Sequence, residues 1–235
     1  MGKLHLFIIS IFLLVVVLMT GCKKKVEIKP ISDIWNIEVK GIPRLVRTNY
    51  IELSKIHRIS KFRSSVGYSY TDFFENCRSM KHSFEPKNDV DWSTVKIYAP
   101  VTGIITMVLK ESTGTQIEII SDEIPAFRFV IFHINLLADL QVYDRVVEGG
   151  ELGTHYSYQT MPDIAVIVND PTRRGKMISY FDVIDDAVFS EYLNRGLNVR
   201  AEMIIPKATR DEDQLFCNAD TFTTTGTLEN WKELN

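Results

Sequence analysis

VKIYAPVTGII (95–105) and YDRVVEGGELG (143–153) are the two stretches of sequence that decide the fold. In each of them, short β-branched segments flank a turn marked by glycine, at Gly103 and at Gly149-Gly150. Other short, mostly alternating segments follow the same pattern and lie at 115–121, 127–134, 151–156 and 163–169. Several strands at this spacing predict an antiparallel sandwich or barrel.

One helix is expected near residue 190. Asp185 or Asp186 can cap AVFSEYLNR (187–195), and Gly196 suits the left-handed residue just past a helix end. Its buried face is expected to consist of Val188, Tyr192 and Leu193. The helix is therefore expected to cover one end of the barrel.

A second, shorter helix is expected within YTDFFENCRSMKHSF (70–84). Its apolar residues recur at helical spacing, which is typical of a buried helix face; they are Phe73, Phe74, Cys77 and Met80. The predicted fold is thus mainly β with one or two flanking helices, α+β overall.

The N-terminus has the pattern of a secretion signal. Lys3 precedes an apolar run over 6–19, which is shorter than the roughly 20 residues that a membrane-spanning helix needs. Met19-Thr20-Gly21-Cys22 follows and resembles the bacterial lipobox, in which the cysteine thiol is acylated and becomes the mature N-terminus. The resemblance implies a lipoprotein signal peptide over 1–21, with lipid such as palmitate on Cys22.

The lipid implies a place in the cell. Attached acyl chains hold a protein on a membrane, and two or more make the attachment stable. We therefore expect a lipid anchor and tether over 22–45, and one globular domain over 46–235 on the extracytoplasmic face of the bacterial envelope. Either the inner or the outer membrane fits the sequence.

Composition and cysteine usage narrow the class of protein. After residues 1–21 are removed, 26 basic and 30 acidic side chains remain, so a nucleic-acid binder is disfavoured. An apolar content of 45% supports a real core. Cys77 and Cys217 remain as an even pair in an exported chain, so a disulfide is expected over two separate thiols.

Four motifs in order resemble the lysostaphin-type (LytM-type) zinc metallopeptidases that cut peptidoglycan crosslinks. They are VKIYAPVTGII (95–105), STGTQIEII (112–120), IFHINLL (131–137), where His133 falls on the family's conserved histidine, and YDRVVEGGELG (143–153). The resemblance implies a duplicated-hybrid-motif barrel with its core at about 90–170.

The metal motifs of that family are missing here. Family members hold zinc through an H-x-x-x-D motif and the second histidine of H-x-H, which leaves one position for water. His82 is followed four residues later by Pro86, and Asp163-Ile164-Ala165 stands where H-x-H is expected. Ala165 has no ligating atom, so at most one expected ligand remains.

Two functions follow from these motifs. The first is a non-catalytic lysostaphin-like lipoprotein, without cofactor, that binds peptidoglycan or an envelope protein. The alternative is a peptidoglycan hydrolase with a rearranged zinc site. In that alternative His82 and His155 hold the metal, and His133 and Asp163 take catalytic roles.

The lipobox generates a direct test. In cells labelled with palmitate, we expect the wild-type chain to carry the label and to sediment with membranes. Cys22→Ser removes the acceptor thiol and should lose both properties, because the acyl chains supply the membrane affinity. Cys77→Ser is the matched control and should stay labelled. Label retained by Cys22→Ser would contradict the prediction.

Overall fold

The computed structural model describes residues 33–235, so the predicted signal peptide and Cys22 lie outside the described residues. Within 33–235, no helix is both long enough and apolar enough to cross a membrane. The helices are short: α1 (Ile37–Lys40), α2 (Tyr180–Val183), α3 (Asp186–Leu193) and α4 (Lys207–Glu212). Three 3₁₀ turns cover Leu53–Lys55, Trp92–Thr94 and Arg200–Met203.

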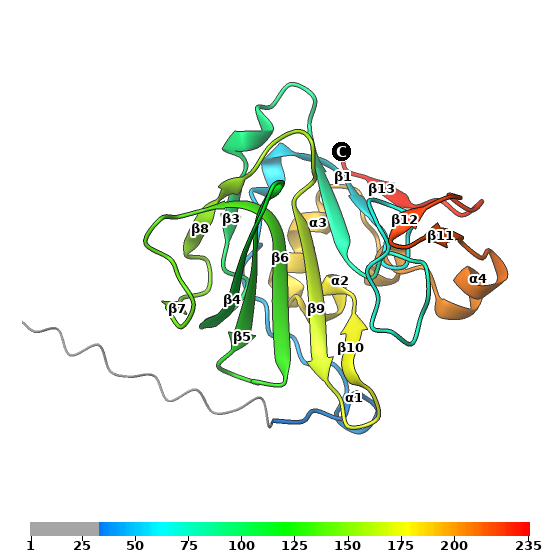
Figure 1. The fold of residues 1–235 in the computed structure, drawn as a ribbon, viewed down its shortest axis with the longest axis horizontal. Helices are drawn as coiled ribbons and strands as arrows, with labels where there is room; N and C mark the ends of the chain where they lie inside the picture. The colour runs from blue at the N-terminus through cyan, green and yellow to red at the C-terminus, as the bar shows by residue number, and fades with distance from the viewer. Residues whose placement is uncertain (1–32) are drawn as a thin grey trace, which may run out of the picture.

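An eleven-stranded antiparallel sheet dominates the molecule (Figure 1). Its main path runs β13-β1-β2-β9-β6-β5-β4-β7, while β10 pairs with β9, and β8 pairs with β3 and β6. The strands are β1 (Ile56–Ser60), β2 (His82–Pro86), β3 (Lys96–Tyr98), β4 (Gly103–Glu111), β5 (Gly114–Ser121), β6 (Phe127–Leu136), β7 (Arg145–Val146), β8 (Glu151–His155), β9 (Asp163–Asn169), β10 (Arg174–Ile178) and β13 (Trp231–Glu233). A separate ribbon pairs β11 (Cys217–Asn218) with β12 (Thr221–Phe222).

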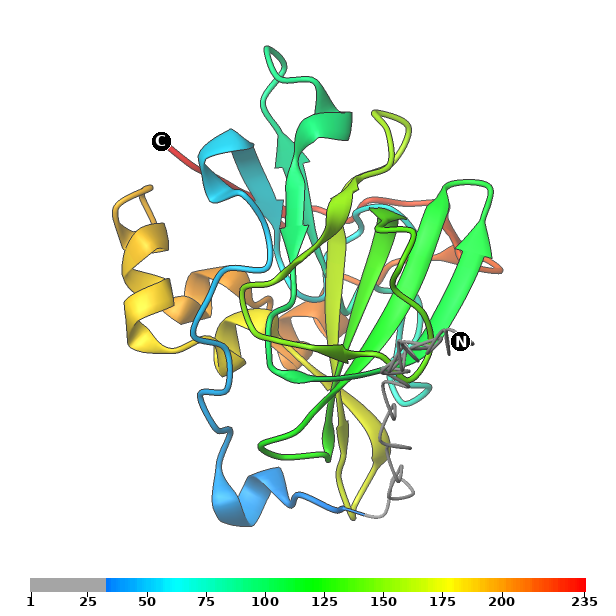
Figure 2. The same ribbon diagram turned by 90° about the vertical axis from the view of Figure 1, so that its left-hand side faces the viewer.

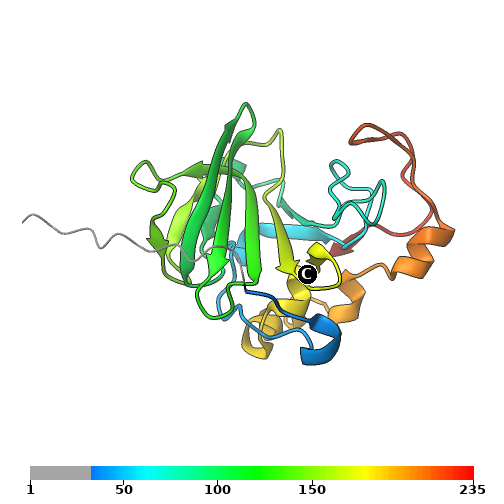
Figure 3. The same cartoon turned by 60° about the horizontal axis from the view of Figure 1, so that its bottom comes forward.

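Strands β6 and β9 form the centre of the sheet. From Phe129 to His133 every residue of β6 is buried, because both faces of this strand are covered. Helices α2 and α3 lie on one side of the sheet (Figure 2), and Figure 3 shows them near α1 on that side. The predicted mainly-β architecture is confirmed.

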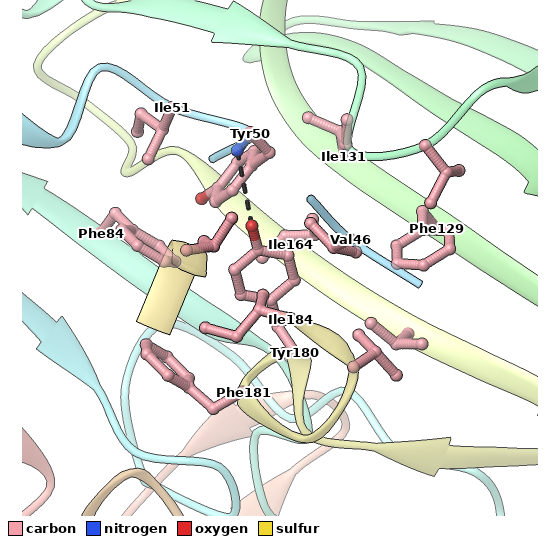
Figure 4. Close-up of a cluster of buried hydrophobic side chains, with 14 of the residues drawn as sticks. Val46, Tyr50, Ile51, Phe84, Phe129, Ile131, Ile164, Tyr180, Phe181 and Ile184 are labelled. Atoms are coloured by element: carbon pink, nitrogen blue, oxygen red, sulfur yellow. Dashed lines mark hydrogen bonds between the residues drawn. The ribbon is translucent and has the colours of Figure 1, made fainter. Parts of the chain in front are cut away.

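Aromatic rings join the helices to the sheet. Tyr50 packs edge-on against Phe84 of β2 and Tyr180 of α2, with ring centroids 4.9 and 5.4 Å apart. The backbone N–H of Tyr50 donates a hydrogen bond to the Tyr180 hydroxyl oxygen at 3.4 Å (Figure 4). These fully buried rings hold α2 against the sheet, on the face of β9 that carries Ile164.

The expected helix near residue 190 is present as α3. The Asp185 side chain caps it by accepting a hydrogen bond from the Val188 backbone N–H at 2.8 Å. Val188 and Tyr192 are buried as predicted, but the prediction for Leu193 is wrong, since that side chain is 42% exposed. Phe189 is buried instead, because the helix turns this neighbouring position toward the core.

The prediction of a helix within 70–84 is wrong. Residues 71–79 are irregular, and the chain then enters β2 at His82. Phe73 has φ 66° and Cys77 has φ 49°, both left-handed, and the Asp72 side chain accepts a hydrogen bond from the Phe74 backbone N–H. Such local bonding competes with the helix. Phe73 and Phe74 are consequently 94% and 57% exposed, whereas Met80 is buried as predicted.

The predicted disulfide between Cys77 and Cys217 is confirmed. Their Cα atoms lie 5.6 Å apart, and the bond spans 140 residues of sequence. It joins the irregular segment before β2 to β11 near the end of the chain. Closing a loop of this length stabilises the fold, by about 5 kcal/mol in the chain-entropy model.

Residues 33–45, part of the expected tether, lie against the globular domain. The Trp35 and Phe127 rings meet edge-to-face at 6.1 Å, and the Asn169 side-chain amide donates to the Asp33 carbonyl oxygen at 2.8 Å. Leu45 belongs to the main core. The chain therefore meets the domain beside the turn between β9 and β10, near α1 in Figure 1.

Candidate functional site

His82 is a buried residue of the core. Its ring lies between Ser60 of β1 and Ser179, with Nδ1 2.7 Å from the Ser60 carbonyl oxygen and Nε2 2.8 Å from the Ser179 hydroxyl. A carbonyl oxygen only accepts, so Nδ1 carries the proton and Nε2 accepts from Ser179. Burial lowers the pKa of His82 from 6.5 to about 4. Both ring nitrogens are therefore engaged in hydrogen bonds within the core.

His155 is also held by backbone groups. Its Nδ1 lies 3.0 Å from the His133 carbonyl oxygen, and its Nε2 lies 2.9 Å from the Thr160 carbonyl oxygen. Burial, the largest cause, lowers the pKa of His155. The ring links β8 to the end of β6 and to the loop before β9, and its contact with His133 is through the main chain.

His133 and Asp163 are brought together, as the predicted catalytic pair requires. His133 Nε2 lies 3.8 Å from Asp163 Oδ2. In the sheet, Asp163 pairs with Phe132 of β6 on one side and with Ser83 of β2 on the other. Strand β9, which lies between β6 and β2, thus places the Asp163 carboxylate between these two strands.

The third member of the cluster is Lys81, which the sequence analysis missed. Its fully buried ammonium contacts Asp163 Oδ2 and lies 3.7 Å from the centre of the Tyr68 ring. Burial, the largest cause, lowers the pKa of Lys81, while the Asp163 charge opposes that shift. Lys81 stands immediately before His82, the residue that motif spacing selected, so proximity in sequence was the available signal.

The backbone of His133 fixes the direction of its ring. His133 has φ 58°, a left-handed conformation that a histidine adopts at an energetic cost. Nδ1 lies 3.0 Å from the Thr113 carbonyl oxygen, so Nδ1 donates. Nε2 is consequently directed to Asp163 and is the ring atom available for proton exchange.

A cavity of about 410 Å³ opens beside the cluster. Its wall combines the charged residues with polar and apolar groups from the loops before β2, after β4 and after β8, namely Gly67, Tyr68, Lys81, Thr113, His133, Gln159, Thr160, Met161 and Asp163. This size and mixed lining fit a small ligand or a short peptide segment.

Ala165 follows Asp163 by two residues in β9, so the two side chains share one face of the strand. Its side chain belongs to a separate apolar cluster. The cluster is made of Phe62, Met80, Val130, Phe132, Ala165 and Met177. Apolar side chains therefore fill the space beside the position where the family motif places a histidine ligand. Across residues 33–235, no group of three or more His, Cys, Asp or Glu side chains is arranged to hold a metal ion.

Solved structures with a similar fold were found for this chain. Helicobacter pylori Csd3 is 20% identical with a TM-score of 0.44, and the match covers 62% of this chain and 34% of Csd3. The chain thus spans about one third of Csd3. The catalytic domain of the antimicrobial peptidase lysostaphin from Staphylococcus simulans is 17% identical, with 48% of this chain and 82% of that domain covered, at a TM-score of 0.36.

A chain of the SpoIIQ-SpoIIIAH pore forming complex also matches. It is 13% identical with a TM-score of 0.43, and 66% of this chain and 99% of that chain are covered. No protein-family model and no curated protein matches the sequence. Lysostaphin-type domains are therefore among the structures that this fold is similar to, as the sequence motifs predicted.

The environment of His82 predicts a pH dependence of stability. The unfolded chain binds a proton near pH 6.5 and the folded chain near pH 4, so the free energy of unfolding falls as pH drops through this window. His82 alone accounts for about 3 kcal/mol of that loss. Urea unfolding at several pH values across the window gives the slope of the free energy of unfolding against pH. This slope should be shallower for His82→Gln, which lacks the titrating ring.

His57→Gln is the matched control, because the His57 side chain is 48% exposed. Its slope should stay steeper than that of His82→Gln. An unchanged slope in His82→Gln would mean that His82 is charged in the folded protein, contrary to its hydrogen bonds.

Proposed function

We propose that this chain is a non-catalytic, lysostaphin-like module of the cell envelope that binds a peptide segment over the cavity beside Lys81. The segment comes from peptidoglycan or from an envelope protein. A lipid on Cys22 holds the module at the membrane. The observation that carries the proposal is the filled site: the Lys81 ammonium lies against the Asp163 carboxylate, and Ala165 lies among apolar side chains.

The pairing of Lys81 with Asp163 favours binding over cutting. A zinc site built on Asp163 needs that carboxylate free to ligate, but a buried cation already compensates it. Lys81 has no exposed side-chain surface, so displacing its ammonium means breaking a buried pair, which costs about 3–5 kcal/mol. The pair therefore stabilises the floor of the cavity in a form that does not activate water.

The wall of the cavity supplies the means of recognition. Tyr68 combines an apolar ring with a hydroxyl, and Gln159 carries an exposed amide with both donor and acceptor atoms. These groups match the amides and small apolar side chains of a peptide. A volume of about 410 Å³ accommodates a few residues of such a segment.

Sedimentation with isolated, protein-free peptidoglycan tests the proposal. We expect the wild-type chain to sediment with it, and Tyr68→Phe combined with Gln159→Ala to bind about tenfold more weakly, because two hydrogen-bonding groups are lost. Tyr143→Phe combined with Gln141→Ala makes the same chemical changes outside the cavity and should bind like the wild type.

Two results would contradict the proposal. Equal binding by both double variants would place the ligand elsewhere on the surface. Chelator-sensitive release of peptides from the peptidoglycan by the wild-type chain would show hydrolysis, and the rearranged zinc site would replace the binding module. If the wild-type chain does not sediment, peptidoglycan is excluded as the source of the segment.

A further inference from the structure

The pair formed by Lys81 and Asp163 has too few hydrogen-bond partners for its burial. Among the described residues, Asp163 Oδ2 is the oxygen that the ammonium contacts, and the aromatic rings of Tyr68 and Phe132 lie 3.7 and 5.0 Å from Nζ. Asp163 Oδ1 is buried and accepts no hydrogen bond in the described structure. Buried charges are costly unless their remaining protons and lone pairs are satisfied.

We propose that Lys81 and Asp163 become joined by an amide bond between Lys81 Nζ and Asp163 Cγ. The register of the sheet brings them together, since Asp163 pairs with Ser83 and Lys81 precedes Ser83 by two residues, so their side chains share a face. Nζ already contacts Oδ2, which is bonded to Cγ. The bond would tie the start of β2 to the start of β9 across 82 residues of sequence.

The reaction is a condensation that needs no other reagent. An ammonium proton first passes to the carboxylate, giving a neutral amine and a carboxylic acid. The lone pair of Nζ then attacks Cγ. Oδ2 leaves as water and takes two of the three original ammonium protons, and the third remains on the amide nitrogen.

His133 is placed to carry a proton in this step. Its Nε2 lies 3.8 Å from Oδ2, the oxygen that leaves, and its Nδ1 is fixed by the Thr113 carbonyl oxygen. Nε2 can accept a proton lost from Nζ and return it to Oδ2 as water departs. The cavity lined by the same residues gives that water a way out.

Two features favour the amide over the ion pair. Side chains held in reacting positions behave as if present at about 10⁵–10⁸ M, which offsets the tendency of an amide to hydrolyse to amine and acid in water. The bond also removes both charges, and Oδ1 becomes a neutral carbonyl oxygen whose missing hydrogen bond costs less. A crosslink here would stabilise the cavity floor whether or not the proposed peptide binds.

Peptide mapping of the full chain tests the bond. After reduction and tryptic digestion we expect one branched species, in which SMKHSFEPK (79–87) is joined to residues 146–173. Its mass should be the sum of the two peptides less one water, because trypsin does not cut after an amidated lysine. Lys81→Arg keeps the charge and Asp163→Ala removes the carboxylate, and both should lose the branched species.

The same digest contains an internal control. Lys207 and Asp211 form an ion pair near the surface, and their peptides should keep full mass.

In His133→Gln the branched species should accumulate more slowly after refolding, and an unchanged rate would overturn the role given to His133. Wild-type protein that yields free 82–87 and unmodified 146–173 would overturn the proposal, with no dependence on how any variant folds.

Discussion

Contact between Lys81 and Asp163 is the constraint on which the site depends. Lys81 precedes β2, Asp163 begins β9, and the two strands pair directly beside them. A buried ammonium and a buried carboxylate are each unfavourable alone, so the pair fixes how these strands meet. His133 and Tyr68 then take positions around it, and the cavity opens over the cluster.

The positions of several strands along the chain could be predicted from sequence because turns and alternation are local signals. Glycine and β-branched residues marked β5, β6, β8 and β9 with boundaries close to those observed. The irregular segment around Phe73 could not be predicted in this way. Its apolar residues have helical spacing, but left-handed residues, the Asp72 side chain and the distant disulfide decide its course.

The site could be predicted in part. Motif order selected His133 and Asp163, and the sheet does bring them together. His82 was selected by spacing as well, yet it lies among Ser60, Ser179 and aromatic rings. Lys81 carried no motif, because nothing in a linear sequence shows that a lysine will be buried against a carboxylate 82 residues away.

We propose that the pair of Lys81 and Asp163 occupies this site in place of a metal ion. The most direct test is the zinc content of the purified, tag-free chain after dialysis against zinc-containing buffer, measured by mass spectrometry of the metal. We expect far less than one zinc per chain. One zinc per chain that is lost on substitution of His133 or Asp163 would contradict it.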